Sequence, residues 1–285
     1  MKIWLIAPWL SAEELVALAK HADVLGFEGI MGADHAFVPK TMAKAYPYTE
    51  DGTPPINGEL PYPAVWSTLA AMATVTERIK FSTAVYVLPL RHPIEVAKEA
   101  AAIARLSDNR LVIGAGAGWM KEEFDVYGID FKTRGKRMCE MIEVMRKLWR
   151  GGYVEHDGEF FNFPQLQIVP APTQDIPIYL GGASDLALKR AARLAQGWIG
   201  AGNSVDEVPA VLRQLNEYRE EYGRKNEPFE TVIAVMQLEQ VERVKALEEL
   251  GMTSAVFGFP DYKTPLADKL KLMDAFAQHL MPKYS

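Results

Sequence analysis

Short apolar runs alternate with amphipathic segments along the whole chain. The runs are rich in branched side chains, and they fall at residues 2–7, 28–33, 79–88, 110–116, 176–180, 197–201, 231–238 and 254–259. The segments between them carry apolar residues at helical spacing, most clearly at 11–25, 64–76, 92–106 and 131–150. Strands alternating with helices predict a parallel sheet, and eight such units predict an α/β fold closed into a (β/α)8 TIM barrel, a single domain over residues 1–285.

Local signals support these helices. Ser11 and Glu14 have the spacing of a capping box at the start of the first helix, and Gly26 ends it. Pro93 lies near the start of the third helix, where its missing N–H costs nothing.

Two stretches interrupt the alternation. Residues 36–64, after the second strand, are rich in Pro, Tyr, Lys and Gly and have no periodicity. A loop of this length in a compact domain is usually functional, often as a lid or a binding loop. Residues 151–173, after the fourth helix, form an irregular insertion with hairpin-like aromatic residues, which are Tyr153, Phe160, Phe161 and Phe163.

Composition and charge exclude several classes of function. The net charge of -6 and the absence of clustered Lys and Arg argue against a nucleic-acid-binding surface. Cys139 is the single cysteine, so no internal disulfide forms and a reducing cytoplasmic location is expected. No apolar run approaches membrane-spanning length, so we expect no membrane anchoring. A small molecule is therefore the expected partner.

The predicted barrel indicates where chemistry is to be sought. Ligands of such barrels bind at the carboxyl ends of the strands, so residues just past each strand are the candidates. By this rule one cavity is lined by Asp34 and His35, Ser82 to Tyr86, Gly116 to Glu122, Gly181 to Ser184, and Trp198 to Gly202.

Glycines replace side chains at alternate positions at the end of the fourth strand. Gly114, Gly116 and Gly118 leave room for a flat ligand to approach the backbone, and Trp119 and Glu122 follow them. The alternative is that the glycines only ease a tight turn or a crowded barrel interior. Spacing alone leaves both interpretations open.

His35 is the histidine whose position suggests chemistry, because it follows the second strand directly beside Asp34. A neighbouring carboxylate can set the tautomer and the pKa of an imidazole. The other four histidines are interpreted as structural. None of the five has metal-ligand spacing, and neither a Cys-x-x-Cys pair nor a Gly-x-Ser-x-Gly elbow is present, so a zinc site and an acyl-transfer triad are not expected.

The motif Gly181-Gly182-Ala183-Ser184 follows the fifth strand and opens a helix. Backbone N–H groups at a helix start, together with a serine hydroxyl, form an anion site suited to a phosphate. The alternative is a helix simply capped by Ser184.

At these residues the chain resembles the luciferase-like flavin and deazaflavin superfamily, in particular its coenzyme F-420 dependent oxidoreductases. The resemblance covers nearly the whole chain. It is carried by Asp34-His35, residues 79–85, Arg91-His-Pro, residues 106–124, Phe131 to Arg137, and Ile178-Tyr-Leu-Gly-Gly-Ala-Ser184 with Gly197-Trp-Ile199.

The resemblance implies a binding mode for the cofactor. The third strand would end in a cis peptide bond between two non-prolines, at Ala84-Val85, so that Thr83, Ala84 and Val85 back the ring. Asp34 and His35 would flank the edge of the ring. The turn with Gly116, Gly118 and Glu122 would lie beside it, and Gly181, Gly182, Ala183 and Ser184 would hold the phosphate.

The resemblance also implies an activity: hydride transfer between coenzyme F-420 and a small organic substrate, with His35, Trp119 and Glu122 as catalytic candidates and a homodimer as the assembly. Sugar-phosphate dehydrogenases of this group carry a glutamate where Trp119 stands, so Trp119 favours a more apolar substrate, with His35 as the proton donor. One alternative is a two-component monooxygenase that uses FMN. Another is a protein that holds the cofactor without catalysis.

Overall fold

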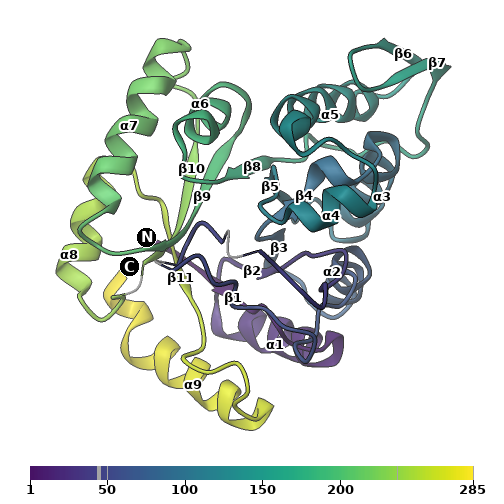
Figure 1. Cartoon of the computed structure of the whole chain (residues 1–285). Coiled ribbons are helices and arrows are strands. Elements are labelled where there is room, and N and C mark those ends of the chain that lie inside the picture. The colour runs from purple at the N-terminus through teal and green to yellow at the C-terminus, as the bar shows by residue number, and fades with distance from the viewer. Residues whose placement is uncertain (44–45, 50, 236, 285) are drawn as a thin grey trace.

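A computed structural model describes residues 1–43, 46–49, 51–235 and 237–284 of the chain. Its parallel strands form a sheet that closes on itself (Figure 1). The strands follow chain order around the ring: β3 pairs with both β2 and β5, and β11 returns to β1. β3 and β4 occupy one position, so the described residues give eight positions, and the predicted (β/α)8 barrel is confirmed. The strands are β1 (Lys2–Ile6), β2 (Gly29–Gly32), β3 (Lys80–Thr83), β4 (Tyr86–Val87), β5 (Leu111–Gly116), β8 (Ile178–Gly181), β9 (Gly197–Asn203), β10 (Glu230–Val235) and β11 (Ser254–Phe257).

Helices cover the outside of the barrel (Figure 1). They are α1 (Ala12–Leu25), α2 (Val65–Ala73), α3 (Pro93–Leu106), α4 (Lys121–Val126), α5 (Arg134–Trp149), α6 (Asp185–Leu194), α7 (Val208–Glu221), α8 (Val241–Ala246) and α9 (Leu266–His279). The predicted capping box of α1 is confirmed, since the Ser11 hydroxyl accepts from the Glu14 N–H at 3.2 Å and Gly26 ends the helix with φ 85°. Among the described helices, none has the length and apolar character needed to cross a membrane.

Some helices have 3-10 turns at their ends, and there the helix boundaries differ from the predicted ones. The predicted helix 131–150 begins with a 3-10 turn, η2 (Phe131–Thr133), and α8 is followed directly by another, η3 (Leu247–Leu250). A third turn, η4 (Met281–Tyr284), follows α9. The seventh apolar run was predicted as a strand to residue 238, but β10 ends at Val235, and residue 236 lies outside the described residues.

The third predicted strand, residues 79–88, is interrupted. β3 ends at Thr83, the peptide bond Ala84-Val85 is cis, and β4 covers only two residues. The chain then enters a 3-10 turn, η1 (Leu88–Leu90), because Pro89 has no N–H to donate to a sheet. The cis bond implied by the family resemblance is therefore present at the expected pair.

The insertion after α5 contains an antiparallel hairpin of β6 (Val154–Asp157) and β7 (Asn162–Leu166), which lies beside α5 in Figure 1. Glu140 of α5 holds it: the carboxylate accepts from the Phe161 N–H at 2.8 Å and lies 3.2 Å from the His156 Nε2. The insertion is thus more regular than the sequence indicates, with Phe161 and Phe163 buried and Tyr153 exposed.

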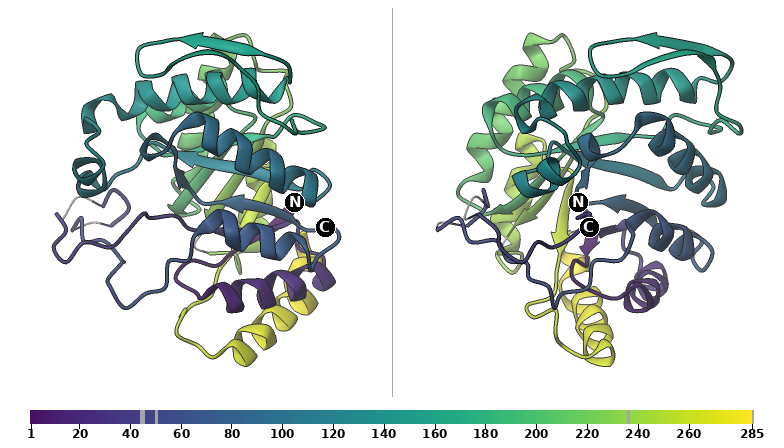
Figure 2. Two further views of the ribbon diagram at one scale, coloured as in Figure 1. Left: turned by 90° about the vertical axis from the view of Figure 1, so that its right-hand side faces the viewer. Right: turned by 45° about the vertical axis from the view of Figure 1, so that its right-hand side comes forward.

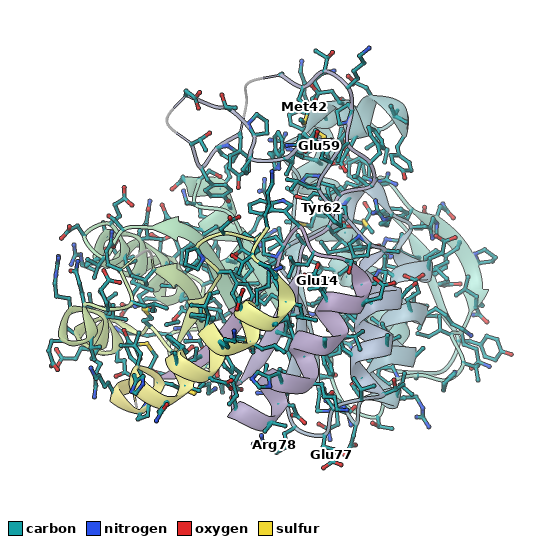
Figure 3. The ribbon with its side chains drawn as sticks, turned by 90° about the horizontal axis from the view of Figure 1, so that it is seen from below. Glu14, Met42, Glu59, Tyr62, Glu77 and Arg78 are labelled. Atoms are coloured by element: carbon teal, nitrogen blue, oxygen red, sulfur yellow. The ribbon has the colours of Figure 1, made fainter. Side chains whose placement is uncertain are left out.

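The long loop after β2 projects from the end of the barrel that holds the carboxyl ends of the strands (Figure 2). Met42 and Glu59 lie on its outlying part, and Tyr62 lies nearer the barrel (Figure 3). Residues 44, 45 and 50 of this predicted loop lie outside the described residues.

The interior of the barrel is filled by side chains. The buried members of this cluster are Trp4, Met31, Val112, Tyr179, Ile199, Val232 and Val256. Ile6, Ala84, Val85 and Ala234 pack on this cluster toward the carboxyl ends of the strands and are only half-buried. The barrel is therefore solid up to these four residues, which form an apolar upper layer. A second, larger cluster fills the space between the strands and the helices.

Gly114 of β5 allows β3 to approach closely. A Cβ atom at residue 114 would lie 1.8 Å from the Thr83 carbonyl oxygen. We expect Gly114→Ala to lower the free energy of unfolding by about 1–3 kcal/mol, because the two strands would have to move apart. Urea denaturation measures this loss. Gly58→Ala is the control, since nothing lies within 4 Å of a Cβ there; equal midpoints for the two variants would contradict the prediction.

Candidate active site

The carboxyl ends of β2, β4, β5 and β8 bring the predicted site segments together. Val87 of β4 pairs with Gly116 of β5, and its N–H donates to Asp34 at 3.0 Å. A Cβ on Gly181 of β8 would lie 3.0 Å from a methyl carbon of Val85. Segments that are far apart in the sequence thus meet around the upper layer of the barrel.

In β9, the position of Trp198 departs from the prediction that Trp198 to Gly202 faces the shared cavity. Trp198 is buried in the cluster between strands and helices, and its indole N–H donates to the Gly182 carbonyl at 2.9 Å. Ile199, the next residue, is the one that fills the barrel interior. Tyr86 likewise packs in the outer cluster rather than inside the barrel.

The glycines of the fourth predicted strand make room for protein atoms. A Cβ at Gly116 would lie 2.5 Å from the Val85 side chain, and one at Gly118 would lie 2.7 Å from the Val87 side chain. The space at Gly114 is taken by the Thr83 carbonyl. The structure thus supports the alternative of a crowded barrel interior at these three glycines, and the contact of a flat ligand with Gly116 and Gly118 stays a prediction.

Thr83 lies beneath the upper layer. Its side chain is fully buried, and its hydroxyl donates to the Gly114 carbonyl at 2.6 Å. Ala84 and Val85, which follow it, are half-buried and belong to the upper layer itself.

His35 follows β2 and its ring is held by a buried carboxylate. The His35 Nδ1 lies 3.2 Å from Oε2 of Glu123 in α4, and the Glu123 Oε1 accepts from the Ala36 N–H at 2.7 Å. The exposed fractions of the two side chains are 10% and 0%. An ionised carboxylate only accepts hydrogen bonds, so it selects the tautomer with the proton on Nδ1 and leaves Nε2 available for chemistry.

Asp34 has a different partner from the one its position beside His35 suggests. Its carboxylate accepts from the Val87 N–H and from Nη2 of Arg91 at 3.3 Å. Burial raises the pKa of the Asp34 carboxyl, and the Arg91 guanidinium opposes this shift. The carboxylate in hydrogen-bond contact with the imidazole is therefore that of Glu123, and Asp34 interacts with His35 only through its charge.

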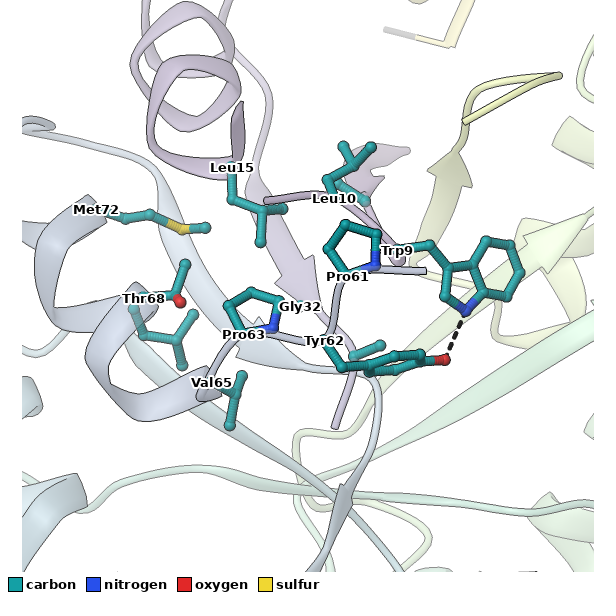
Figure 4. A pocket seen from close by; sticks show the side chains of 13 residues that line it. Trp9, Leu10, Leu15, Gly32, Pro61, Tyr62, Pro63, Val65, Thr68 and Met72 are labelled. Atoms are coloured by element: carbon teal, nitrogen blue, oxygen red, sulfur yellow. Dashed lines mark hydrogen bonds between the residues drawn. The ribbon is translucent and has the colours of Figure 1, made fainter. Parts of the chain in front are cut away.

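Aromatic rings surround His35. The ring of Tyr62 lies 5.4 Å and that of Trp119 lies 5.6 Å from the His35 ring, both edge to face. Tyr46 packs on Trp119 with ring centroids 5.1 Å apart. The Trp9 indole N–H donates to the Tyr62 hydroxyl at 2.5 Å (Figure 4). Burial raises the pKa of Tyr62, so its hydroxyl stays neutral at physiological pH.

Glu122 and Glu123 have separate tasks. The Glu122 side chain turns to the long loop, where it accepts from the Ala43 N–H at 2.8 Å. Trp119 lies beside His35 as the resemblance implies, but the carboxylate that contacts the imidazole is that of Glu123 rather than Glu122. The sequence held one signal that Glu123 is buried, namely that it precedes the apolar residue Phe124. The signal is weak, because α4 is too short for a helical period to show which of its residues face the protein.

Gly181 to Ser184 open α6. The Ser184 hydroxyl accepts from the Ala187 N–H at 3.3 Å, so the capping alternative is present, and Gly182 has φ 104°. Ala183 and Ser184 are exposed. The first N–H groups of a helix have no partner within it, so this end of α6 also remains suited to an anion. In the part of the chain that the structure describes, no three His, Cys, Asp or Glu side chains gather as metal ligands.

The fold and this arrangement define a luciferase-like barrel, and the sequence agrees. A sequence model described as luciferase-like monooxygenase matches residues 5–279, and the chain therefore belongs to this family. An uncharacterized protein of Mycobacterium tuberculosis is 37% identical over 275 residues, which cover 94% of each chain. An F-420-dependent glucose-6-phosphate dehydrogenase of Nakamurella multipartita is 26% identical over 265 residues, which cover 91% of this chain and 73% of the relative.

Solved structures with low sequence identity share the fold. An F-420-dependent secondary alcohol dehydrogenase in complex with an F-420-acetone adduct has a TM-score of 0.80 at 15% identity. The match covers 100% of this chain and 99% of the dehydrogenase chain. The oxygenating constituent of 3,6-diketocamphane monooxygenase of Pseudomonas putida, in complex with FMN, has a TM-score of 0.75 at 17% identity with the same coverage.

The contact between Glu123 and His35 predicts a fixed tautomer. We expect Glu123→Gln to shift His35 from the Nδ1-protonated toward the Nε2-protonated form, because an amide can donate to Nδ1 where a carboxylate cannot. Nitrogen chemical shifts of histidine-labelled protein report the tautomer. Glu122→Gln is the matched control, since Glu122 contacts the long loop instead. An unchanged tautomer in Glu123→Gln, or equal shifts in both variants, would argue against the assignment.

Proposed function

We propose that this protein is a coenzyme F-420 dependent oxidoreductase that transfers a hydride between the cofactor and a small organic substrate. The observation that carries the proposal is the pair of His35 and the buried Glu123, just past the carboxyl end of β2. A histidine with one nitrogen fixed and the other available is suited to moving a proton.

The described residues fit a flat tricyclic group with an anionic tail. Ile6, Ala84, Val85 and Ala234 form an apolar, half-buried surface over a filled barrel, which is the kind of surface on which a ring can lie. Ala183 and Ser184 at the amino end of α6 would receive a phosphate through backbone N–H groups and a hydroxyl.

The protein would contribute orientation and proton transfer. The cofactor, when bound, supplies the hydride chemistry. His35 would give a proton to, or take one from, the substrate atom beside its Nε2, while Glu123 keeps Nδ1 engaged. Trp119 and Tyr62 would form apolar walls that exclude water from this exchange.

The identity of the relatives supports the choice of cofactor and limits the substrate. F-420 is named both in the glucose-6-phosphate dehydrogenase and in the secondary alcohol dehydrogenase that resemble this chain. Trp119, which stands where the sugar-phosphate enzymes carry a glutamate, favours an apolar substrate over a sugar phosphate.

A second candidate is a two-component monooxygenase that uses FMN. The FMN-bound camphane monooxygenase, with a TM-score of 0.75, supports this alternative. Titration of the purified protein with F-420 and with FMN, followed by cofactor fluorescence, separates the two. Tight binding of F-420 supports the proposal, and tight binding of FMN alone overturns it. Bound reduced cofactor that no electrophilic acceptor oxidises would instead indicate a cofactor-holding protein.

The role of His35 gives a kinetic prediction. His35→Ala is expected to leave cofactor affinity unchanged and to lower kcat by about 10²–10⁴-fold, because proton transfer by a positioned side chain contributes that much. Stopped-flow oxidation of the reduced cofactor measures it. His21→Ala serves as the control, since His21 lies on α1 and pairs with Asp274. Unchanged turnover in His35→Ala would refute the assigned role.

A further inference from the structure

A cavity of about 390 Å³ is lined in part by Trp9, whose indole N–H donates to Tyr62 of the candidate site. Three connecting segments line this partly open cavity: residues 9–10 after β1, residues 59–61 at the end of the long loop, and residues 262–265 before α9, with Glu14 and Lys269 from α1 and α9. Glu14 and Glu59 lie on either side of Tyr62 in the view of Figure 3. This volume is in the range of small-molecule sites, about 300–1,000 Å³.

One wall of this cavity is aromatic and apolar. The rings of Trp9 and Tyr262 meet edge to face with centroids 5.1 Å apart, and Leu10, Leu60 and Pro61 complete the wall. Burial raises the pKa of Tyr262 to about 12, so its hydroxyl is neutral at physiological pH. Such a wall is suited to a flat apolar group, which can pack on ring faces and edges.

The polar part of the lining carries Lys263 and Lys269 as cations and Glu14 and Glu59 as carboxylates, and Lys263 and Glu59 are exposed. Lys269 is almost fully buried and donates to Oε1 of Glu14 at 2.9 Å, while the other Glu14 oxygen accepts from the Ser11 N–H at 3.4 Å. An ammonium has three donors, and Glu14 takes one of them. Lys263 adds a second cation, and α9 begins at this part of the lining without a side-chain cap on its first N–H groups.

We propose that this cavity is a binding site for an aromatic carboxylate, with its ring against Trp9 and Tyr262 and its carboxylate toward Lys269 and the amino end of α9. The site is one side chain from the candidate active site, since the Trp9 indole N–H bonds Tyr62 and the ring of Tyr62 lies 5.4 Å from that of His35. This site is separate from the proposed function. Its binding test uses cofactor-free protein, so its result does not depend on whether the protein uses F-420.

Isothermal titration of the cofactor-free protein with naphthoate and its neutral isostere naphthamide tests the ligand class. We expect naphthoate to bind at least about tenfold more tightly than naphthamide. Absence of naphthoate binding at about 1 mM, or equal affinities for the two probes, would overturn the proposal.

Two pairs of variants test the location. Leu60→Trp fills the cavity and is expected to weaken naphthoate binding at least about tenfold, whereas Leu272→Trp, on an exposed position of α9, leaves it unchanged. Lys269→Met is expected to abolish the preference for the acid, whereas Lys271→Met, whose side chain is 77% exposed, retains it. Thermal melts verify folding. Undiminished naphthoate binding in folded Leu60→Trp, or an undiminished acid preference in Lys269→Met, would place the ligand elsewhere.

Discussion

Val85 is held between glycines of two neighbouring strands, and the upper layer of the barrel depends on this contact. Its methyl groups occupy the space where side chains on Gly116 and Gly181 would stand, and the Thr83 carbonyl occupies that of Gly114. Glycine in a strand costs backbone entropy, and here that cost is offset by strand packing that no larger residue permits. The glycines therefore let Ala84 and Val85 form the apolar surface at the strand ends.

Two buried carboxylates fix the segment after β2 from opposite sides. Asp34, in that segment, binds the Val87 N–H of β4, and Glu123 of α4 binds the Ala36 N–H of the segment. Each carboxylate also engages a side chain, Arg91 in one case and His35 in the other. The imidazole is thus positioned by its own backbone as well as by its hydrogen bond, and the two contacts together restrict the orientations of the ring.

The sequence predicted the alternation of strands and helices because each unit carries its own period and caps, as at Ser11 and Gly26. It did not predict the partner of His35, since Glu123 lies 88 residues away and only the closed barrel brings the two together. The sequence also did not predict that Trp198 faces the helices and Ile199 the barrel interior. A strand buried on both faces is apolar throughout, so its sequence does not show which residue points to which face. The continuous apolar run at 79–88 concealed the break in the third strand, and the family resemblance supplied the cis bond.

Trp9 links the surroundings of His35 to the neighbouring cavity. Its φ of 60° is a left-handed conformation, which costs a non-glycine residue roughly 1–2 kcal/mol. The hydrogen bond to Tyr62 and the edge-to-face contact with Tyr262 hold it there from both sides. A ligand that moved the indole would therefore also release the Tyr62 hydroxyl, and with it one of the rings that pack on His35. The segment after β1 thus joins the residues that line the cavity to the rings that pack on His35.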